Sequence, residues 1–343
     1  MDATLKNREV LVIGAGFIGA MIANQLANTD RRVTVVDAHK VAQGATRQAV
    51  GLVTPRLTKE HLQDTTRGVG IVNNLAMGLG VPSKACRVLH LANSPADSLA
   101  LHELCNVLGS GKPKLTWETS PSIIPAGFDG GVLSYSGLLV DIEALTARLL
   151  RHVGIKVYEG IEIQSLDFHD GRLSAMAHGH TVRTDAVVLA TNAYAGMLAP
   201  TLADAARVVR TVSWSSRPLK TESGLIARIL QVLPVPMVID HAHMMVAQTL
   251  DGRVHISAWR WPQGQSEDDP GGDIRLFLQT HLPELWEHTE EWRTGAMSVT
   301  PDGAPLVGRQ TGKGLVLHAL GAGPHGAAWA PTMAEHIVQL LEE

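Results

Sequence analysis

The sequence has very little cysteine. Cys86 and Cys105 are the only two cysteines in 343 residues, and they do not form a CxxC pair. This excludes a disulfide-stapled scaffold and a cysteine-rich metal site, because each needs several thiols at suitable spacing. The sequence also has no HExxH motif and no histidine cluster with metal-ligand spacing, so we expect no metal site. So few cysteines suit a reducing compartment, and we expect a cytoplasmic protein.

Long hydrophobic runs and blocks of like charge are also missing. No stretch has the roughly 20 uncharged apolar residues that a membrane span needs, and the first ten residues contain no apolar signal core. Lysine and arginine number 29 against 33 aspartates and glutamates, which gives a net charge of −4. Without a basic run that could follow a phosphate backbone, we expect neither a membrane nor a nucleic acid as a partner. The 45% of hydrophobic residues suffices for a large core, in two domains or in one that another interrupts.

The first 40 residues do contain a strand, a tight turn, a helix and a second strand. Residues 10–13 are four apolar residues in a row, which is typical of a strand buried on both faces. The turn after them has the spacing GxGxxG, formed by Gly14, Gly16 and Gly19, and Asp37 ends the second strand. In such a unit the glycines bring the helix N-terminus close to a pyrophosphate, and the carboxylate accepts hydrogen bonds from a ribose. The pattern predicts a dinucleotide site, and by itself it fits NAD and FAD equally.

Further patterns place the rest of this domain much later in the chain. A helix is predicted just after Asp141, a fully apolar strand at 186–190, and a strand at 314–320 followed by a final helix. Between them, residues 244–249 and 253–259 alternate in polarity and are joined by Asp-Gly, a strong β-hairpin signal. We therefore expect a discontinuous cofactor domain that a mainly antiparallel substrate domain interrupts twice.

A second segment rich in small residues, 44–47 followed by Gly51, comes after the second strand. Such a segment could cover a pyrophosphate and pass close to a flat ring. With this segment the chain resembles the FAD-dependent amine and amino-acid oxidoreductases of the D-amino-acid oxidase, glycine oxidase and sarcosine oxidase group. Six segments carry the resemblance, in the order that the family has: VIGAGFIG at 12–19 with VVDA at 35–38, GATRQAVG at 44–51, GIKVYEGIEIQSL at 154–166, AVVLATNAYAGML at 186–198, TPDGAPLVG at 300–308 and HALGAGPHGAAWAP at 318–331.

The resemblance implies an α/β fold, with a Rossmann-like FAD-binding domain and an inserted, mainly antiparallel α+β substrate domain. We expect the FAD-binding domain at 1–85, 141–204 and 294–343, and the substrate domain at 86–140 and 205–293. The residues that the resemblance implies in FAD binding are Gly14, Gly16, Phe17, Ile18, Gly19, Asp37, Ala38, Ala45, Thr46, Gly51, Ile163, Thr191, Ala193, Gly321, Gly323, His325 and Gly326.

The clearest departures from the family pattern concern the carboxylate of the substrate. Where glycine-oxidase-like members carry a carboxylate-binding arginine before TPDG, this chain has Met297, and Met245 replaces an assisting tyrosine. We expect these two residues and Trp259 to lie together over the substrate face of the flavin, in a cavity more apolar than the usual pocket. A free carboxylate then needs another anchor, for which the candidate cations are Arg56, Arg260 and Lys220.

Four further positions concern the cofactor. Asn192 replaces the glycine that is usual in the ATG-like motif. Gly295 and Ala328 stand where the sarcosine oxidase branch has a flavin-linking cysteine and a lysine, which implies non-covalent FAD. His325 belongs to the segment that brings the final helix to the pyrimidine edge of the flavin, where the helix dipole favours the anionic reduced ring. We name His325 a candidate acid or base, with a structural hydrogen bond in the turn as the alternative.

The resemblance predicts an enzyme that removes a hydride from a carbon bearing nitrogen, producing an imine that water hydrolyses. The expected substrate is a small amine or amino-acid-like compound, and no side-chain nucleophile is required. Two alternatives stay open: a dehydrogenase that passes electrons to a quinone or a protein partner, and a flavin-binding subunit without turnover of its own. The oligomeric state is left open.

GATRQAVGLVTPRL also resembles the oxidase part of the bifunctional enzyme that trims a carboxymethylaminomethyl group on the wobble uridine of tRNA. We rank that function lower, because the sequence shows no methyltransferase half and no basic run.

Overall fold

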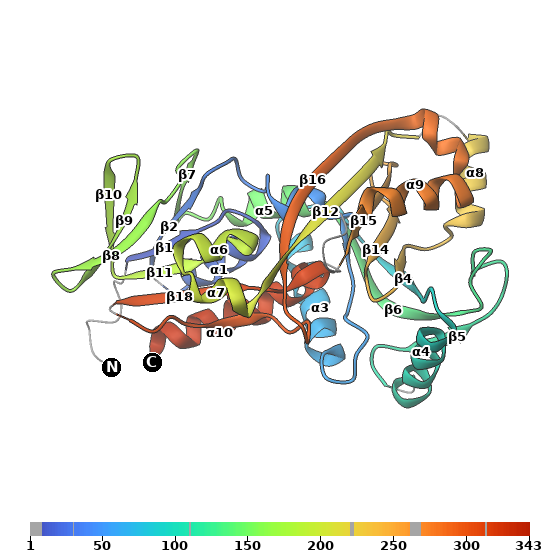
Figure 1. The fold of residues 1–343 in the computed structure, drawn as a ribbon, viewed down its shortest axis with the longest axis horizontal. Coiled ribbons are helices and arrows are strands. Elements are labelled where there is room, and N and C mark those ends of the chain that lie inside the picture. The colour runs from blue at the N-terminus through green and yellow to red at the C-terminus, as the bar shows by residue number, and fades with distance from the viewer. Residues whose placement is uncertain (1–8, 30, 110, 220–222, 261–268, 313) are drawn as a thin grey trace. The chain divides into compact units, whose positions relative to one another are not determined.

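The computed structural model describes residues 9–29, 31–109, 111–219, 223–260, 269–312 and 314–343 (Figure 1). The chain divides into two compact units, and each unit combines separate segments of the sequence. The first unit comprises Met1–Arg47, Ile142–Val208 and Ala296–Glu343, and the second comprises Gln48–Asp141 and Val209–Gly295. No helix within the described ranges has both the length and the apolar character that crossing a membrane requires.

A six-stranded sheet forms the centre of the first unit, in the order β17-β18-β11-β1-β2-β7. Neighbouring strands from β18 to β7 run parallel, and β17 runs antiparallel to β18 at the edge. The central strands β1 and β11 are almost wholly buried, which explains their unbroken apolar runs. The bounds are β1 (Glu9–Ile13), β2 (Arg32–Asp37), β7 (Ile155–Glu159), β11 (Ala186–Leu189), β17 (Leu306–Arg309) and β18 (Leu315–Leu320).

Helices and a small second sheet complete the first unit. Helix α1 (Phe17–Ala27) packs against α5 (Ile142–Leu149) and α10 (Gly326–Glu342). A three-stranded antiparallel sheet is formed by β8 (Ser165–His169), β9 (Arg172–Ala177) and β10 (His180–Thr184). The shorter elements are α2 (Ala45–Gln48), η2 (Asn192–Tyr194), α6 (Ala195–Leu198), α7 (Thr201–Ala205) and η4 (Gly323–His325). Parallel strands with helical crossovers form a Rossmann-like arrangement, with turns gathered at the carboxyl edge of the sheet.

The second unit is built on a nine-stranded sheet in the order β16-β12-β15-β14-β13-β4-β6-β3, with β5 paired to β6. Strand β13 pairs with β4 in parallel, and β14 and β15 form the antiparallel hairpin that the sequence predicts. The bounds are β3 (Leu52–Val53), β4 (Ser83–Leu91), β5 (Leu115–Glu118), β6 (Gly131–Val140), β12 (Arg207–Ser216), β13 (Met237–Ile239), β14 (Met244–Gln248), β15 (Val254–Trp259) and β16 (Thr289–Val299).

Helices cover one face of this sheet. Alternate strand residues such as Trp214, Val246 and Ile256 form a buried cluster with Ile229 of α8 and Leu278 of α9. The helices of the second unit are α3 (Leu62–Gly78), α4 (Pro95–Leu108), α8 (Ser223–Val232), α9 (Pro270–His281) and η3 (Pro283–His288). The residues between those of the cluster point to the other face, which carries Met245 and Trp259.

The division of the chain differs from the predicted domain boundaries in one long segment. From the sequence, residues 48–85 are assigned to the FAD-binding domain, whereas the structure places them in the second unit. The reason is strand pairing: Leu52 of β3 lies opposite Leu139 of β6, and β4 begins at Ser83 and joins the same sheet. These partners are far apart in the sequence, so no local pattern indicates the pairing.

Candidate functional site

The glycine-rich turn connects β1 to α1 at the carboxyl edge of the parallel sheet. Gly14 has φ +110, and its N–H donates to the Val36 carbonyl at 2.8 Å. A Cβ on Gly14 would overlap the Ala190 carbonyl oxygen, and a Cβ on Gly19 would overlap the Gly14 carbonyl oxygen. The packing of the turn itself therefore requires both glycines.

Gly16 differs from these two glycines, because the space beside it is open. Its backbone is extended, with φ −74 and ψ 179, and a Cβ there would meet the Thr46 hydroxyl oxygen at 3.3 Å. The same hydroxyl oxygen accepts a hydrogen bond from the Phe17 N–H at 3.0 Å. Amides in the first turn of a helix have no acceptor within the helix, so this end of α1 is suited to receive a phosphate.

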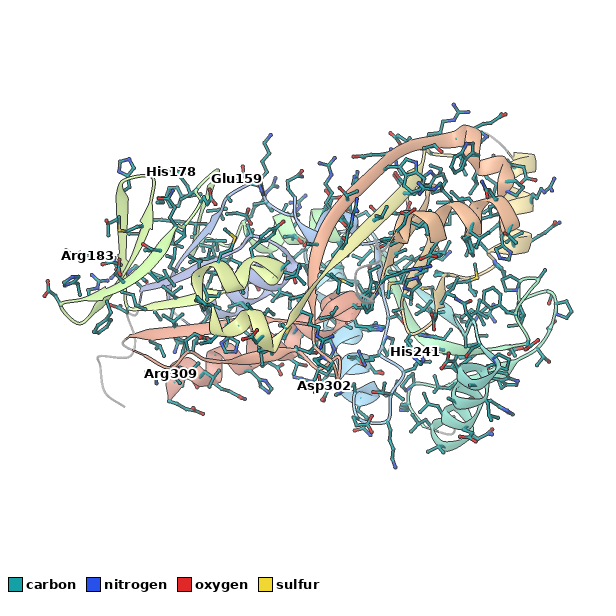
Figure 2. All side chains as sticks on the ribbon, in the orientation of Figure 1. Glu159, His178, Arg183, His241, Asp302 and Arg309 are labelled. Carbon is teal, nitrogen blue, oxygen red and sulfur yellow. The ribbon has the colours of Figure 1, made fainter. Side chains whose placement is uncertain are left out.

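The Asp37 carboxylate lies at the end of β2 and is held by two backbone amides. Its Oδ2 accepts from the Ala15 N–H at 2.7 Å, and its Oδ1 accepts from the His39 N–H at 2.8 Å. Each carboxylate oxygen has a second lone pair that can accept from a ribose hydroxyl. A hydrogen bond links the segment after β2 to the end of β7. Oε1 of Glu159, labelled in Figure 2, accepts it from the Val41 N–H at 2.7 Å.

Three other residues that the resemblance implies in FAD binding lie in this unit, among them Ile163, for which backbone contacts to adenine are expected. Ala38 follows β2 and is exposed, and Ala45 begins the short helix α2. The Ile163 side chain is 7% exposed and packs in a cluster with Leu11 and Val36, so only its backbone is available for a contact with adenine.

Asn192 adopts φ +50, in the left-handed region that asparagine tolerates better than most residues. Its Oδ1 accepts from the Ser298 N–H at 2.8 Å and from the Ser298 hydroxyl at 2.7 Å. The Ser298 Oγ in turn accepts from the Gly321 N–H at 2.9 Å. A glycine at 192 could take the same backbone conformation but could not link the loop after β11 to the turn after β18. Ser298 is not among the residues predicted from the sequence. The signal that could have indicated it is Asn192, a polar residue where the family usually has glycine.

The hydroxyl of Thr191, just before Asn192, is buried and has no hydrogen-bond partner among the described residues. Leaving a buried hydroxyl unpaired costs free energy, so this atom is suited to a ligand. Ala193 is half-buried in η2 beside it.

The third turn connects β18 to α10. Gly321 and Gly323 have φ +77 and +55, and a Cβ on Gly321 would lie 2.8 Å from Thr300 Cγ2. His325 is buried in this turn, and Gly326 begins α10. A Cβ on Gly326 would lie 3.8 Å from Cδ1 of Ile18, which places the first turns of α10 and α1 side by side.

These three turns fit a dinucleotide cofactor. Gly16 leaves open space, the Thr191 hydroxyl is unpartnered, and Asp37 offers lone pairs, all in the first unit. Two adjacent helix N-termini favour negative charge, as on a pyrophosphate or a reduced flavin ring.

Residues 9–340 match the family described as DAO, FAD dependent oxidoreductase. The chain belongs to this family. FAD is therefore its cofactor, and the family resemblance and the α/β fold predicted from the sequence are confirmed.

Comparison with individual proteins gives distant relatives. The tRNA 5-methylaminomethyl-2-thiouridine biosynthesis bifunctional protein MnmC of Maricaulis maris (strain MCS10) is 26% identical, over 99% of this chain and 53% of its own length. The chain spans about half the length of this curated relative, and 33% of the length of one from Pseudomonas putida. Glycine oxidase from Bacillus cereus ATCC 14579 has a TM-score of 0.78 at 18% identity, with 98% of this chain and 95% of that chain covered. L-proline dehydrogenase from P. horikoshii has a TM-score of 0.78 at 19% identity, with 97% and 94% covered.

Met245 and Trp259 lie on one face of the sheet in the second unit. Met245 is opposite Ser257, and Trp259 is two residues further along the same strand as Ser257. Met245 is 7% exposed and packs in an apolar cluster that includes Val50, and the Trp259 indole N–H donates to the Ala242 carbonyl at 2.8 Å. Met297 is 7% exposed and belongs to the first unit, so its place beside these two stays a prediction.

Arg260 is engaged on the opposite face of the sheet. Its guanidinium binds the Asp273 carboxylate of α9 through two hydrogen bonds, one of them from Nε to Oδ2 at 2.7 Å. His243 Nε2 lies 3.0 Å from the same Oδ2. Because α9 covers the face away from Met245, the structure does not bring this predicted carboxylate anchor to the predicted substrate face.

The other predicted positions of the second unit have separate surroundings. The N–H of Arg56, in the loop before α3, donates to the Thr65 hydroxyl at 3.0 Å. A Cβ on Gly51, which has φ +72, would lie 2.9 Å from the Val140 carbonyl oxygen, so the strand pairing itself requires this glycine. Lys220 lies outside the described residues.

The place of the flavin-linking cysteine is filled by another side chain. A Cβ on Gly295 would overlap the Gln48 carboxamide nitrogen. The carbonyl oxygen of that carboxamide accepts a hydrogen bond from the Thr211 hydroxyl. A thiol at position 295 would therefore have to displace Gln48.

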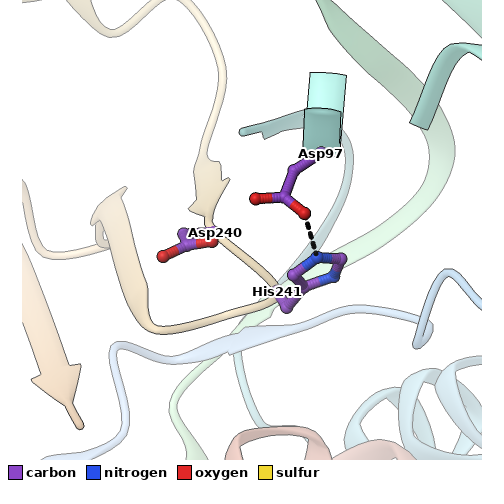
Figure 3. A group of neighbouring side chains, drawn as sticks. All are labelled: Asp97, Asp240 and His241. Atoms are coloured by element: carbon purple, nitrogen blue, oxygen red, sulfur yellow. Dashed lines mark ion pairs between the residues drawn. The ribbon is translucent and has the colours of Figure 1, made fainter. Parts of the chain in front are cut away.

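A group of ionisable side chains lies elsewhere in the second unit (Figure 3). His241 Nε2 is 3.7 Å from Asp97 Oδ1, and ligand atoms of these two residues and Asp240 lie within 4.8 Å of one another. A hydrogen bond from Ser94 and the neighbouring His241 lower the pKa of Asp97. The group lies at the surface, because His241 is exposed and both aspartates are only half-buried. Within it, His241 and Asp97 form the ion pair.

Burial, followed by the nearby positive charge of Arg293, lowers the pKa of His255 from 6.5 to about 4. Between pH 4 and 6.5 the unfolded chain then binds a proton at this residue that the folded chain does not. We expect the free energy of unfolding to fall by up to about 3 kcal/mol as the pH drops from 7 to 4. Urea unfolding at several pH values should show a smaller fall for His255→Gln, which has no proton to bind. Equal pH dependence of the two proteins would contradict this expectation.

Proposed function

We propose that this chain oxidises a carbon–nitrogen bond of a small amine or amino-acid-like compound, with FAD held non-covalently. The observation that carries the proposal is the set of three turns in the first unit, in which Gly16, Asp37 and Thr191 offer space and partners for a dinucleotide. Bound FAD supplies a hydride acceptor, and the protein supplies position and exclusion of water. The substrate carbon loses a hydride, the resulting imine is hydrolysed, and no side-chain nucleophile is needed.

The decisive experiment is anaerobic mixing of the purified yellow protein with amines, amino acids and N-alkyl glycines. We expect at least one class to bleach the flavin absorbance, and acid denaturation to release intact FAD into the supernatant because Gly295 cannot form a thioether. Flavin that stays with the precipitated chain would contradict the non-covalent proposal. Bound FAD that no compound reduces would favour a flavin-binding subunit without turnover. The rate of reoxidation by oxygen separates an oxidase from a dehydrogenase that uses a quinone or a protein.

A second candidate substrate is an aminomethyl group on a tRNA nucleoside. It is favoured by the match of 99% of this chain to MnmC, whose name describes tRNA modification. The net charge of −4 weakens it, because binding to a phosphate backbone depends on clustered lysine and arginine. Flavin bleaching by hypomodified tRNA, with no bleaching by free amines, would make this the function.

A further inference from the structure

The face of the sheet that carries Met245 also carries a row of serine hydroxyls. Ser257 of β15 lies opposite Met245 of β14 on one side and opposite Ser213 of β12 on the other. Directly opposed residues of antiparallel strands point to the same face, so these three side chains form one row across the sheet. The next row along the same face pairs Thr211 with Trp259.

Ser213 stands out within this row because its hydroxyl has nothing to bind. The residue is 1% exposed, and Oγ has no hydrogen-bond partner among the described residues. The opposite face is different in kind, since the neighbouring Val212 and Trp214 pack there in the apolar cluster. One row further along from Ser213, Nε2 of His255 is a second buried atom without a partner.

The side chains that strand register places beside Met245 on β15 and β12 are neutral. Two ionisable groups lie further out: His90 is in the same row beyond Val238, and Arg293, whose charge acts on His255, is paired with Glu291 at 2.5 Å. Ser213, Ser257, Thr211 and Trp259 do not ionise near neutral pH, and Arg260 is held on the other face by Asp273. A carboxylate buried among such groups would lose its hydration without gaining a cation. A neutral group with both a donor and an acceptor would instead pair with the hydroxyls without that loss.

We propose that Ser213 and Ser257 bind an uncharged hydrogen-bonding group of the substrate beside Met245, a carboxamide or a hydroxyl in place of a free carboxylate. This rests on the proposed amine oxidation and narrows its substrate class. It also changes the expected character of the site, because hydroxyls accompany the thioether in a cavity that the sequence predicts to be apolar.

The test compares flavin reduction by matched pairs, glycinamide with glycine and sarcosinamide with sarcosine. The measured quantity is the amide-to-acid ratio of the second-order rate constant for anaerobic bleaching. We expect this ratio to be at least tenfold lower in Ser213→Ala than in the wild-type protein, since the variant loses the hydroxyl that pairs with the amide. Dividing one protein's ratio by the other's cancels the different basicities of the amino groups. Equal ratios in the two proteins would overturn the proposal.

Two controls separate binding from a structural role. Ser215 is the same residue type on the same strand and face, one row further along and opposite His255, so Ser215→Ala should keep the wild-type ratio. Ser213→Ala should also keep or raise the melting temperature of the apoprotein, because the removed hydroxyl has no partner to lose. A lowered melting temperature together with an unchanged ratio would identify Ser213 as structural and overturn the proposal.

A binding experiment keeps this inference separate from amine oxidation. Acetamide and acetate cannot be oxidised as amines, and their binding is followed by the absorbance shift of the oxidised flavin. We expect acetamide to bind at least tenfold more tightly than acetate, and Ser213→Ala to remove the difference. If no amine reduces the flavin but acetamide behaves in this way, the proposed oxidation fails and the site stands. If amines reduce the flavin but acetate binds more tightly, the site fails and the oxidation stands.

Discussion

Gly16→Val should yield a folded protein that no longer binds FAD. Gly16 has an extended backbone that valine adopts without strain, and the space beside it is open apart from the Thr46 hydroxyl. The added side chain would occupy the place expected for the pyrophosphate, so we expect a loss of affinity of at least a thousandfold, or about 4 kcal/mol. Flavin fluorescence titration of the apoprotein measures the affinity, and circular dichroism checks the fold.

Gly19→Ala is the matched control for this experiment. A Cβ at position 19 would overlap the Gly14 carbonyl oxygen, so this variant should lower the melting temperature of the apoprotein before any ligand is considered. The two glycines of one motif thus separate binding from folding. Wild-type FAD affinity in Gly16→Val would show that the pyrophosphate does not pass over this turn.

Met297→Arg should shift the substrate preference toward carboxylate-bearing amines. A charge-assisted bidentate contact with a carboxylate contributes about 1.5 to 3 kcal/mol, so we expect turnover of glycine and sarcosine to improve roughly ten- to a hundredfold. Met297 is 7% exposed, so a guanidinium there has little water to solvate it, and the melting temperature should fall and recover when acetate is added.

Met297→Leu is the control for this substitution, because it keeps a neutral side chain of similar volume and should leave the preference unchanged. Rates of anaerobic flavin reduction with matched acids and amides provide the comparison. A variant that retains FAD and still prefers the same compounds as the wild-type protein would show that position 297 does not face the substrate.

The distribution of charge on the second unit links these expectations. Arg260 and Asp273 neutralise one another on the helix-covered face, and on the other face Met245 lies opposite the neutral Ser257. The resemblance implies that Met245 and Met297 stand where the family has a tyrosine and an arginine. This expectation and the unpartnered Ser213 hydroxyl both support the proposed neutral substrate group.

Local sequence was sufficient to predict the glycine-rich turn for which we propose a role in FAD binding. Four apolar residues at 10–13, three spaced glycines and a carboxylate at the end of the next strand form a unit whose contacts lie within 40 residues. Gly14 adopts φ +110, and a Cβ on Gly19 would overlap the Gly14 carbonyl oxygen, so these two glycines have a reason within the turn that the pattern expresses. Periodicity also located the β14–β15 hairpin, because alternation and an Asp-Gly turn are local signals too.

Long-range pairing determined the features that the sequence did not reveal. Residues 48–85 belong to the second unit because β3 and β4 pair with β6, whose residues come much later in the chain. Charge alone makes Arg260 a candidate anchor, and only the folded chain shows that Asp273 of α9 binds its guanidinium. In the sequence Asn192 is only a departure from the family motif. The fold places Ser298 beside it and Gly321 beside Ser298, and hydrogen bonds connect the three residues.

The sequence by itself thus determined the glycine-rich turn between the first strand and helix, because glycine spacing and apolar periodicity act over a few residues. The family and FAD were indicated by the resemblance of six segments, and the family match confirms both. The tertiary structure decided which side chains share a face. That choice depends on strand register, and a shift by one residue would exchange the Ser213 and Ser257 face for the face of Trp214 and Ile256. Register is set by contacts between segments distant in the sequence, so the row of hydroxyls beside Met245 became visible only in the folded chain.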